Sequence, residues 1–228
     1  MITFHVITLF PESLLSYLEA SIVRRAGEKG LIAVKCYNPR DYVVLPKGKK
    51  ANYADRRVDN RPYGGGPGMV IEAMPVVKAI EDAVGKKLKT AASKKKVKIL
   101  FFSPGGKQFS NVAADSFKGY SDIVLISGRY EGIDARVNKI FKTEALSVGP
   151  YTLTGGELPA MIVIDAVTRR LPGALGHDSS IEELRIASSD VYTRPEMIEY
   201  KGKKYKVPKI LLTGHHAKID EWKLKGKK

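Results

Sequence analysis

Short apolar runs alternate with amphipathic segments through the first three quarters of the chain. The runs are rich in β-branched and aliphatic residues, which favour strands, and they cover residues 3–9, 31–37, 97–102, 123–126 and 145–148. Between and after them, apolar residues recur every three or four positions, as on one face of a helix, in residues 11–27, 74–88, 109–117, 133–141 and 157–171. This alternation predicts an α/β fold, with a parallel sheet and helices on both of its faces.

Each of the last three predicted strands runs into a segment that contains glycine. These segments read SPGGKQ at 103–108, SGRYEG at 127–132 and GPYTLTGG at 149–156. Parallel strands end at one edge of a sheet, and ligands of open sheets bind beyond that edge. We therefore predict one ligand pocket, formed by three turns that follow these strands.

A fourth glycine-dense segment, RPYGGGPGM at 61–69, lies at the end of a long polar stretch that begins at residue 38. A connection of this length inside a compact domain is usually functional. Turn formation alone would also explain the glycines, because tight turns need backbone conformations that glycine adopts freely.

The charge of the chain indicates its partner. The 228 residues carry a net charge of +15, with an isoelectric point near 9.7, which favours polyanions and nucleic acid above all. The alternative is a lysine-rich proteome in which every surface is basic. Ten lysines and two acids lie between residues 201 and 228. We predict a first domain at 1–171, a linker at 172–189 and a basic, mainly helical second domain at 190–228.

Several classes of function are excluded by motifs that the sequence lacks. Without a GxxxxGK[ST] loop, or a GxGxxG after the first strand, neither P-loop hydrolysis nor an ordinary Rossmann site is supported. The four histidines and the single Cys36 have no zinc-ligand spacing, and no GxSxG motif marks an acyl-transfer nucleophile. The lone cysteine fits a reducing compartment. With no leader and no run of roughly 18 apolar residues, we expect a cytoplasmic protein that does not enter a membrane.

The predicted turns combine main-chain polar groups with Arg129, Tyr130, Glu131, Asp134 and Glu157. Main-chain amides and carbonyls are suited to an uncharged purine ring and ribose. A neutral cofactor that carries a nucleoside therefore fits this pocket better than a triphosphate does.

Six segments taken in order resemble one known family: VDNRPYGGGPGM, SPGGKQ, SGRYEGID, SVGPYTLTGGELPAM, RLPGALG and YTRPE. Over nearly its whole length the chain is similar to bacterial tRNA (guanine-N1)-methyltransferases of the SPOUT class, which modify the guanosine at tRNA position 37. The resemblance implies a deep trefoil knot, which periodicity does not predict because threaded chains are rare. It also implies a homodimer in which two subunits share each active site.

The resemblance further implies that S-adenosyl-L-methionine binds, bent, in the loops of the knot. The expected contacts are Phe101, Pro104, Gly128, Glu131, Val148, Gly149, Pro150, Tyr151, Thr152, Leu153, Gly155 and Gly156. At Pro150 the family pattern has an aspartate, and because proline lacks an amide donor, any contact there would use its carbonyl. A magnesium (Mg2+) requirement is also implied, although no ligand cluster for a metal is visible in the sequence.

Guanine N1 becomes a nucleophile when it loses its proton, so the reaction needs a base near N1 and a stabilising group at O6. The resemblance assigns the O6 contact to Arg169, whose ordinary role at a helix end would be with the helix dipole and solvent. The base corresponds most closely to Glu183 of the linker, where the family has aspartate. Glu182 and Asp178 are the alternatives, and a solvated surface carboxylate is the ordinary interpretation of all three.

Asp59, Arg61 and Tyr63 are expected to contact the substrate, with residues 61–68 covering the cofactor or positioning the target base. The basic second domain would hold the tRNA anticodon stem-loop through its phosphates, and the target guanosine would follow another guanosine. Two alternatives stay open: a non-catalytic RNA-binding protein, and a SPOUT methyltransferase that acts on a different RNA.

Overall fold

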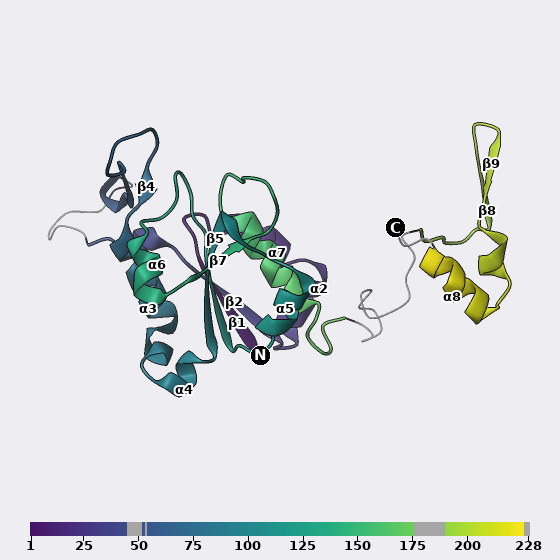
Figure 1. Cartoon of the computed structure of the whole chain (residues 1–228), viewed down its shortest axis with the longest axis horizontal. Helices are drawn as coiled ribbons and strands as arrows, with labels where there is room; N and C mark the ends of the chain where they lie inside the picture. Colours follow the sequence, from purple (N-terminus) through teal and green to yellow (C-terminus); the bar gives the residue numbers. More distant parts are fainter. Residues whose placement is uncertain (45–51, 53, 176–189, 226–228) are drawn as a thin grey trace. The chain divides into compact units, whose positions relative to one another are not determined.

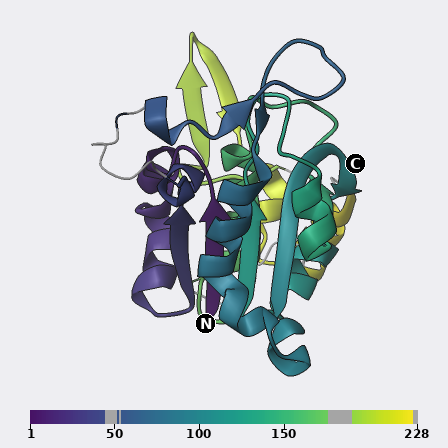
Figure 2. The ribbon, with the colours of Figure 1, turned by 90° about the vertical axis from the view of Figure 1, so that its left-hand side faces the viewer.

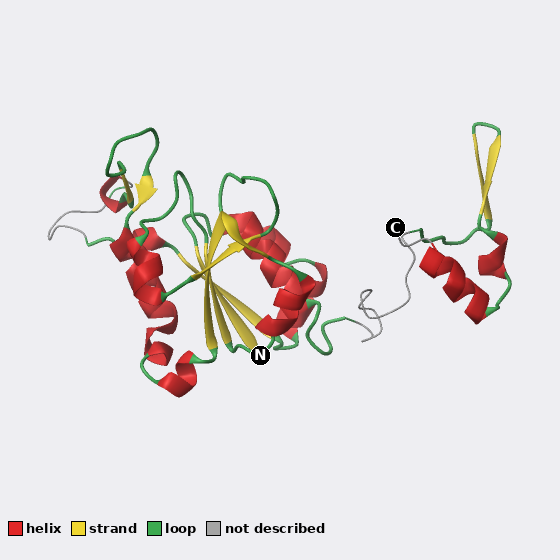
Figure 3. Cartoon of the chain, in the orientation of Figure 1, coloured by secondary structure: helices red, strands yellow, loops and turns green. Residues whose placement is uncertain are grey.

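The computed structural model describes residues 1–44, 52, 54–175 and 190–225. It contains a five-stranded sheet in the order β2-β1-β6-β5-β7, in which every neighbouring pair is parallel. The strands are β1 (Ile2–Ile7), β2 (Ile32–Tyr37), β5 (Val97–Gln108), β6 (Asp122–Ile126) and β7 (Glu144–Ser147). Helices cover both faces (Figure 3), so the predicted α/β architecture is confirmed.

Two groups of helices enclose the sheet. One face is covered by α3 (Ala73–Leu88) and α6 (Arg136–Phe141), which lie in front of the strands in Figure 2. The other face is covered by α2, α5 and α7 (Figure 1), and α1 packs against α7. These four helices are α1 (Glu12–Leu18), α2 (Ser21–Glu28), α5 (Asn111–Phe117) and α7 (Glu157–Thr168).

Strand β6 lies at the centre of the sheet and is buried on both faces. Ile123 and Leu125 belong to the apolar cluster under α2, α5 and α7, whereas Val124 and Ile126 belong to the cluster under α3 and α6. Successive side chains of a strand point to opposite faces, so a strand covered on both sides needs an uninterrupted apolar run. The run at 123–126 is therefore a strand although it shows no alternation.

The single helix predicted for residues 11–27 is wrong, because the chain forms α1 and α2 there. Ala20 is extended (φ −114°, ψ 148°) and Ser21 has φ 48°, so the helix is interrupted between them. Both helices pack against α7. Because they bury their apolar residues against the same neighbour, these residues keep a helical spacing across the interruption. Periodicity alone could not detect it.

The turn predicted at 103–108 is also wrong, because β5 continues through this segment to Gln108. Its register against β7 shifts between Phe102 and Lys107, which both pair with Leu146. A Cβ added to Gly106 would lie 2.6 Å from the carbonyl carbon of Ala145. Glycine here allows an irregular strand to approach its neighbour closely, rather than to turn away from it.

A small two-stranded ribbon lies beside the turn that follows β6. It consists of β3 (Asp59–Asn60) and β4 (Val70–Ile71), and the loop 61–69 joins the two strands. Ile71 forms a parallel bridge with Ile133, and the Glu131 amide donates to the Met69 carbonyl (3.0 Å). The loop is thus attached next to the turn that follows β6.

Short helices also form in two polar segments between the main elements. The short helices η1 (Pro39–Tyr42) and η2 (Ala54–Arg56) lie in the long polar stretch, and α4 (Ala91–Lys94) lies in the lysine-rich one. The Thr90 side chain caps α4 by accepting a hydrogen bond from the Ser93 amide.

The chain divides into two compact units, Met1–Leu175 and Gly176–Lys228. In the second, β8 (Met197–Tyr200) and β9 (Lys203–Lys206) form an antiparallel hairpin, followed by η5 (Lys209–Leu212) and α8 (His216–Lys225). The prediction that this part is mainly helical missed the hairpin. The sequence signal for the hairpin was the glycine of the pair Lys201 and Gly202. In the structure these residues have φ values of 50° and 72°, as in a two-residue hairpin turn. None of the described helices has the length and apolar character needed to cross a bilayer.

Candidate functional site

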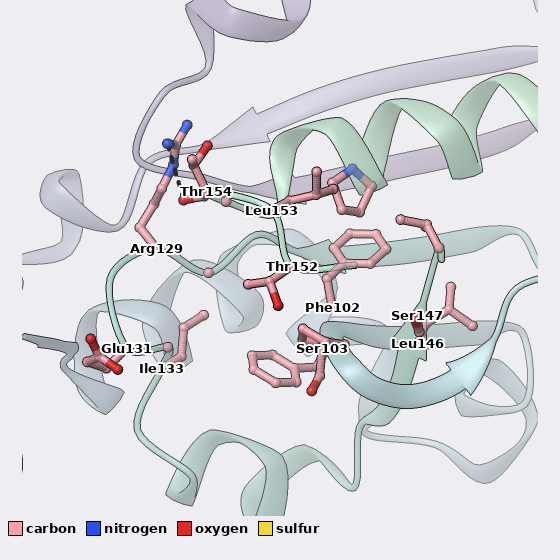
Figure 4. Close-up of a pocket in the computed structure, with 18 of the residues that line it drawn as sticks. Phe102, Ser103, Arg129, Glu131, Ile133, Leu146, Ser147, Thr152, Leu153 and Thr154 are labelled. Carbon is pink, nitrogen blue, oxygen red and sulfur yellow. Dashed lines mark hydrogen bonds between the residues drawn. The ribbon is translucent and has the colours of Figure 1, made fainter. Parts of the chain in front are cut away.

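A cavity of about 530 Å³ opens beside the carboxyl ends of β6 and β7 and the middle of β5 (Figure 4). Its walls come from the segments 101–104, 128–133, 146–149 and 151–156, with Ala135, Asn138 and Pro159. The volume lies in the usual range for a small-molecule site. The three motif segments therefore meet at one pocket, as predicted, although the first of them belongs to a continuing strand and not to a turn.

Most of the residues predicted to contact the cofactor line this cavity. They are Phe101, Pro104, Gly128, Glu131, Val148, Gly149, Tyr151, Thr152, Leu153, Gly155 and Gly156. Pro150 is exposed and does not belong to the lining. The role of all these residues in cofactor binding stays a prediction.

Three glycines of the lining allow close approach of the walls. An added Cβ would lie 2.3 Å from the Tyr151 ring at Gly149, 2.4 Å from Arg129 Nε at Gly155, and 2.5 Å from Ser127 Cα at Gly156. The Gly156 amide also donates to the Gly128 carbonyl (3.0 Å), which holds two walls of the cavity together.

The turn after β6 carries the charged groups of the site. Tyr130 has φ 58°, and Glu131 follows it on the cavity wall. Gly68, at the end of the 61–69 loop, packs on this carboxylate, because a Cβ there would lie 2.6 Å from Glu131 Cγ. In Figure 4, Glu131 and Ile133 lie on one side of the cavity and Arg129 extends beside Thr154.

Sequence reasoning noted Arg129 and Glu157 but did not pair them. Glu157, the first residue of α7, is buried, and its Oε2 lies 3.0 Å from Arg129 Nη2. The hydroxyl of Thr8 donates to Glu157 Oε1 (2.7 Å). Thr8 was missed altogether, although it follows β1 at the same edge of the sheet and the rule that located the other strand ends applies to it.

The residues predicted to bind substrate do not line the cavity. Asp59 forms an ion pair with Arg57 (3.1 Å), while Arg61 and Tyr63 are exposed on the glycine-rich loop. This loop extends beyond the cavity edge of the sheet (Figures 1 and 2). Substrate contact by these three residues stays a prediction.

Arg169 caps the carboxyl end of α7, whose first turn borders the cavity. Twelve residues of rise separate it from Glu157, or about 18 Å along the helix. Arg170 points elsewhere, as expected, and its guanidinium pairs with Asp115 on α5 (2.6 Å). Arg169 therefore lies away from the cavity of its own chain.

The candidate bases Glu183, Glu182 and Asp178 fall outside the described residues. Within residues 1–44, 52, 54–175 and 190–225, no group of three or more His, Cys, Asp or Glu side chains is arranged to hold a metal ion. The magnesium requirement stays a prediction.

Comparison with known proteins identifies the family. A family model described as tRNA (Guanine-1)-methyltransferase TrmD matches residues 2–228. The tRNA (guanine-N(1)-)-methyltransferase of Pseudomonas putida (strain W619) is 44% identical over 227 residues, which is 96% of this chain and 82% of that protein. Its counterpart in Clostridioides difficile (strain 630) is 39% identical over 224 residues, 96% of this chain and 90% of that protein.

A solved structure agrees with the sequence relatives. The crystal structure of tRNA (m1G37) methyltransferase from Aquifex aeolicus matches with a TM-score of 0.74 and 36% identity, and covers 98% of this chain and 88% of that one. The resemblance drawn from the six motifs is thus confirmed. The chain belongs to the tRNA (guanine-N1)-methyltransferase family.

Proposed function

We propose that this enzyme methylates N1 of the guanosine at tRNA position 37 when another guanosine precedes it. Family membership implies a tRNA substrate and S-adenosyl-L-methionine as the methyl donor. The observation that carries the proposal is the glycine-walled cavity beside the three parallel strands β5, β6 and β7.

The cavity fits such a donor. Close packing at Gly149, Gly155 and Gly156 leaves main-chain groups at its surface, while Phe101 and Phe102 supply aromatic walls. When bound, the donor supplies an electrophilic methyl carbon next to a positively charged sulfur. The residues of the cavity orient this group and limit the access of water.

The protein must supply a base and an O6 contact. In our proposal Glu183, or Glu182 or Asp178 in its place, takes the proton of guanine N1. Arg169 donates hydrogen bonds to O6, where negative charge develops as N1 is deprotonated. These roles come from the family resemblance and define variants that can be tested.

The position of Arg169 supports a homodimer with a shared site. About 15 Å of helix separate it from Pro159, the α7 residue that lines the cavity of its own chain, so in this proposal a second copy brings the arginine to the cavity. Leu158 and Ile162, one turn apart on α7, are exposed, as is Leu15 on α1. An apolar face of this kind is suited to a second copy of the chain.

The second unit is suited to holding the anticodon stem-loop. Ile198, Tyr200, Lys203 and Tyr205 lie on one face of the β8–β9 hairpin, because they form two directly opposed pairs on alternate positions. All four are exposed, and Lys203 lies 5.5 Å from the Tyr205 ring centre. Exposed aromatic rings can stack on unpaired bases while lysines contact phosphates.

Three other features belong to the same proposal: the trefoil knot, stimulation by Mg2+ and a cytoplasmic location. They follow from the family or the composition of the chain. Each stays a prediction.

A labelling experiment tests the proposed function. The enzyme is incubated with radiolabelled S-adenosyl-L-methionine and anticodon arms that carry guanosine at positions 36 and 37, with and without Mg2+. We expect label in N1 of the second guanosine, and a large loss when position 36 is changed. The absence of label in every condition, with salt-sensitive tRNA binding retained, would indicate a non-catalytic RNA-binding protein. Label in another RNA alone would indicate a different target.

A further inference from the structure

A buried carboxylate links three segments behind the cavity wall. Glu157 has only 3% of its surface exposed, and each of its oxygens has a different neighbour. Oε1 accepts a hydrogen bond from the Thr8 hydroxyl (2.7 Å), and Oε2 lies 3.0 Å from Arg129 Nη2. These residues come from the end of β1, the start of α7 and the turn after β6. The carboxylate therefore bridges segments up to 149 positions apart in sequence.

Arg129 extends the bridge to two more groups. Its guanidinium carbon lies 4.6 Å from the centre of the Phe10 ring, and Nη1 donates to the Thr154 carbonyl (3.5 Å), the contact drawn in Figure 4. Arg129 itself lines the cavity. One guanidinium thus joins the 128–133 wall to the 151–156 wall and stacks on the ring of Phe10, in the segment that follows β1.

The bridge depends on Gly155. A Cβ at this position would lie 2.4 Å from Arg129 Nε and 2.6 Å from Glu157 Oε2. The φ of Gly155 lies outside the left-handed region, so the backbone conformation does not require glycine. Glycine is required because the ion pair occupies the space of a side chain.

The chemistry of the bridge favours an organising role. A buried charge is costly unless it is paired, and removal of one partner leaves the other uncompensated. Glu157 is not part of the cavity lining, whereas Arg129 is. Its effect on a ligand must therefore pass through Arg129 and the two walls that Arg129 joins.

We propose that Glu157 and Thr8 are positioning residues for the methyl-donor site. Together they hold Arg129 in the orientation that keeps the 128–133 and 151–156 walls at binding distance from each other. This inference rests on the proposed function, because it requires that the donor binds in this cavity. It assigns no proton transfer or group transfer to either residue.

The first test uses two substitutions at one position, of which one keeps the shape of threonine and the other keeps its hydroxyl. Thr8→Val removes the hydroxyl that holds Glu157, and Thr8→Ser keeps it. Binding of S-adenosyl-L-homocysteine, the demethylated donor, is measured by calorimetry, together with kcat and KM for methylation. We expect Thr8→Val to weaken binding and raise KM for the donor about tenfold, a change of roughly 1.4 kcal/mol, with a smaller effect on kcat. Thr8→Ser should restore most of the affinity.

A double-mutant cycle then asks whether Thr8 acts through Arg129. The variants are Thr8→Val, Arg129→Gln and their combination, with the free energy of donor binding as the readout. If both residues act through Glu157, the second substitution adds little to the first, so the effects are non-additive. Arg136→Gln is the matched control, because it breaks an exposed ion pair with Asp134 near the cavity and should leave affinity unchanged.

The outcomes separate this inference from the function itself. If the wild-type enzyme does not bind the demethylated donor, the proposed function fails. If it binds, but Thr8→Val binds equally well or the cycle is additive, the positioning role is refuted. A purely structural role is identified if Thr8→Val lowers the melting temperature while affinity, measured well below it, stays at the wild-type level. That result also refutes the inference.

Discussion

Asp122 allows a quantitative test of how the sheet is stabilised. Its buried carboxylate lies at the start of β6, 2.6 Å from Lys87 Nζ, 2.9 Å from His5 Nε2 and 2.7 Å from the Ser121 hydroxyl. Burial by itself would raise the pKa of Asp122, but hydrogen bonds from Lys87, His5 and Ser121 outweigh it and lower the pKa. The charged carboxylate is therefore the form that the fold requires.

The substitution Asp122→Ala removes the carboxylate that accepts hydrogen bonds from a buried donor and from a half-exposed one. His5 is buried, and loss of its partner should cost about 1–3 kcal/mol. The Lys87 side chain is 50% exposed and regains hydration, so its ion pair adds at most about 1 kcal/mol. We expect the free energy of unfolding to fall by about 1–4 kcal/mol in total.

Urea denaturation followed by far-UV circular dichroism measures this loss. Tryptophan fluorescence is unsuitable, because the single Trp222 belongs to the other unit. With a slope of about 2–3 kcal/mol per molar urea, the midpoint should fall by about 1 M. Glu28→Gln, which breaks an exposed pair with Arg24, is the control and should change stability by less than about 0.5 kcal/mol.

The pH dependence identifies the charge as the cause. Burial lowers the pKa of His5 from 6.5, so the unfolded chain binds this proton first and stability falls as the pH drops below 6.5. Asp122 has a pKa below 3.8, so its contribution is complete above pH 3.8 and is lost as the pH falls through the folded value. Asp122→Asn should reduce this second loss, to which Asp115 and Asp134 also contribute. An unchanged acid profile, or a loss below 0.5 kcal/mol for Asp122→Ala, would refute the reasoning.

Three other predictions concern the strand irregularity and the proposed chemistry. Gly106→Ala should lower the melting temperature by several degrees because its Cβ would meet the β7 backbone at 2.6 Å, whereas Gly105→Ala, with no atom within 4 Å, should not; equal melting temperatures would contradict this. Arg169→Ala should lower kcat far more than donor affinity, since the O6 charge develops in the transition state; equal losses would mean that the role is wrong. Glu183→Gln should behave in the same way, and if Asp178→Asn does so instead, Asp178 is the base.

The strands were predictable because the residue pattern of each strand reflects which of its faces are buried. A strand buried on both faces needs an unbroken apolar run, as at 123–126, and this requirement is local. The hairpin after Met197 was missed although its turn residues, Lys201 and Gly202, were visible in the sequence. The many lysines around it favoured a helical interpretation over the alternation that the structure displays.

The position of the cavity was also predictable, because parallel strands end at a common edge. The reasons for individual glycines were not. Gly106 lets β5 approach the β7 backbone where the register between these strands shifts, and Gly155 leaves room for an ion pair. Both depend on which strand or side chain lies opposite, and a one-dimensional pattern does not contain that information.

The sequence by itself determined the class of fold, the edge of the sheet at which the cavity lies and the family of the chain. These follow from periodicity, from glycine placement and from motifs that are contiguous in the chain. The tertiary structure decided that α1 and α2 are separate helices, that Thr8 and Arg129 meet at Glu157, and that Arg169 lies far from its own cavity. The physical reason is that local spacing reports which faces are buried, whereas contacts between distant segments are set by strand order and packing.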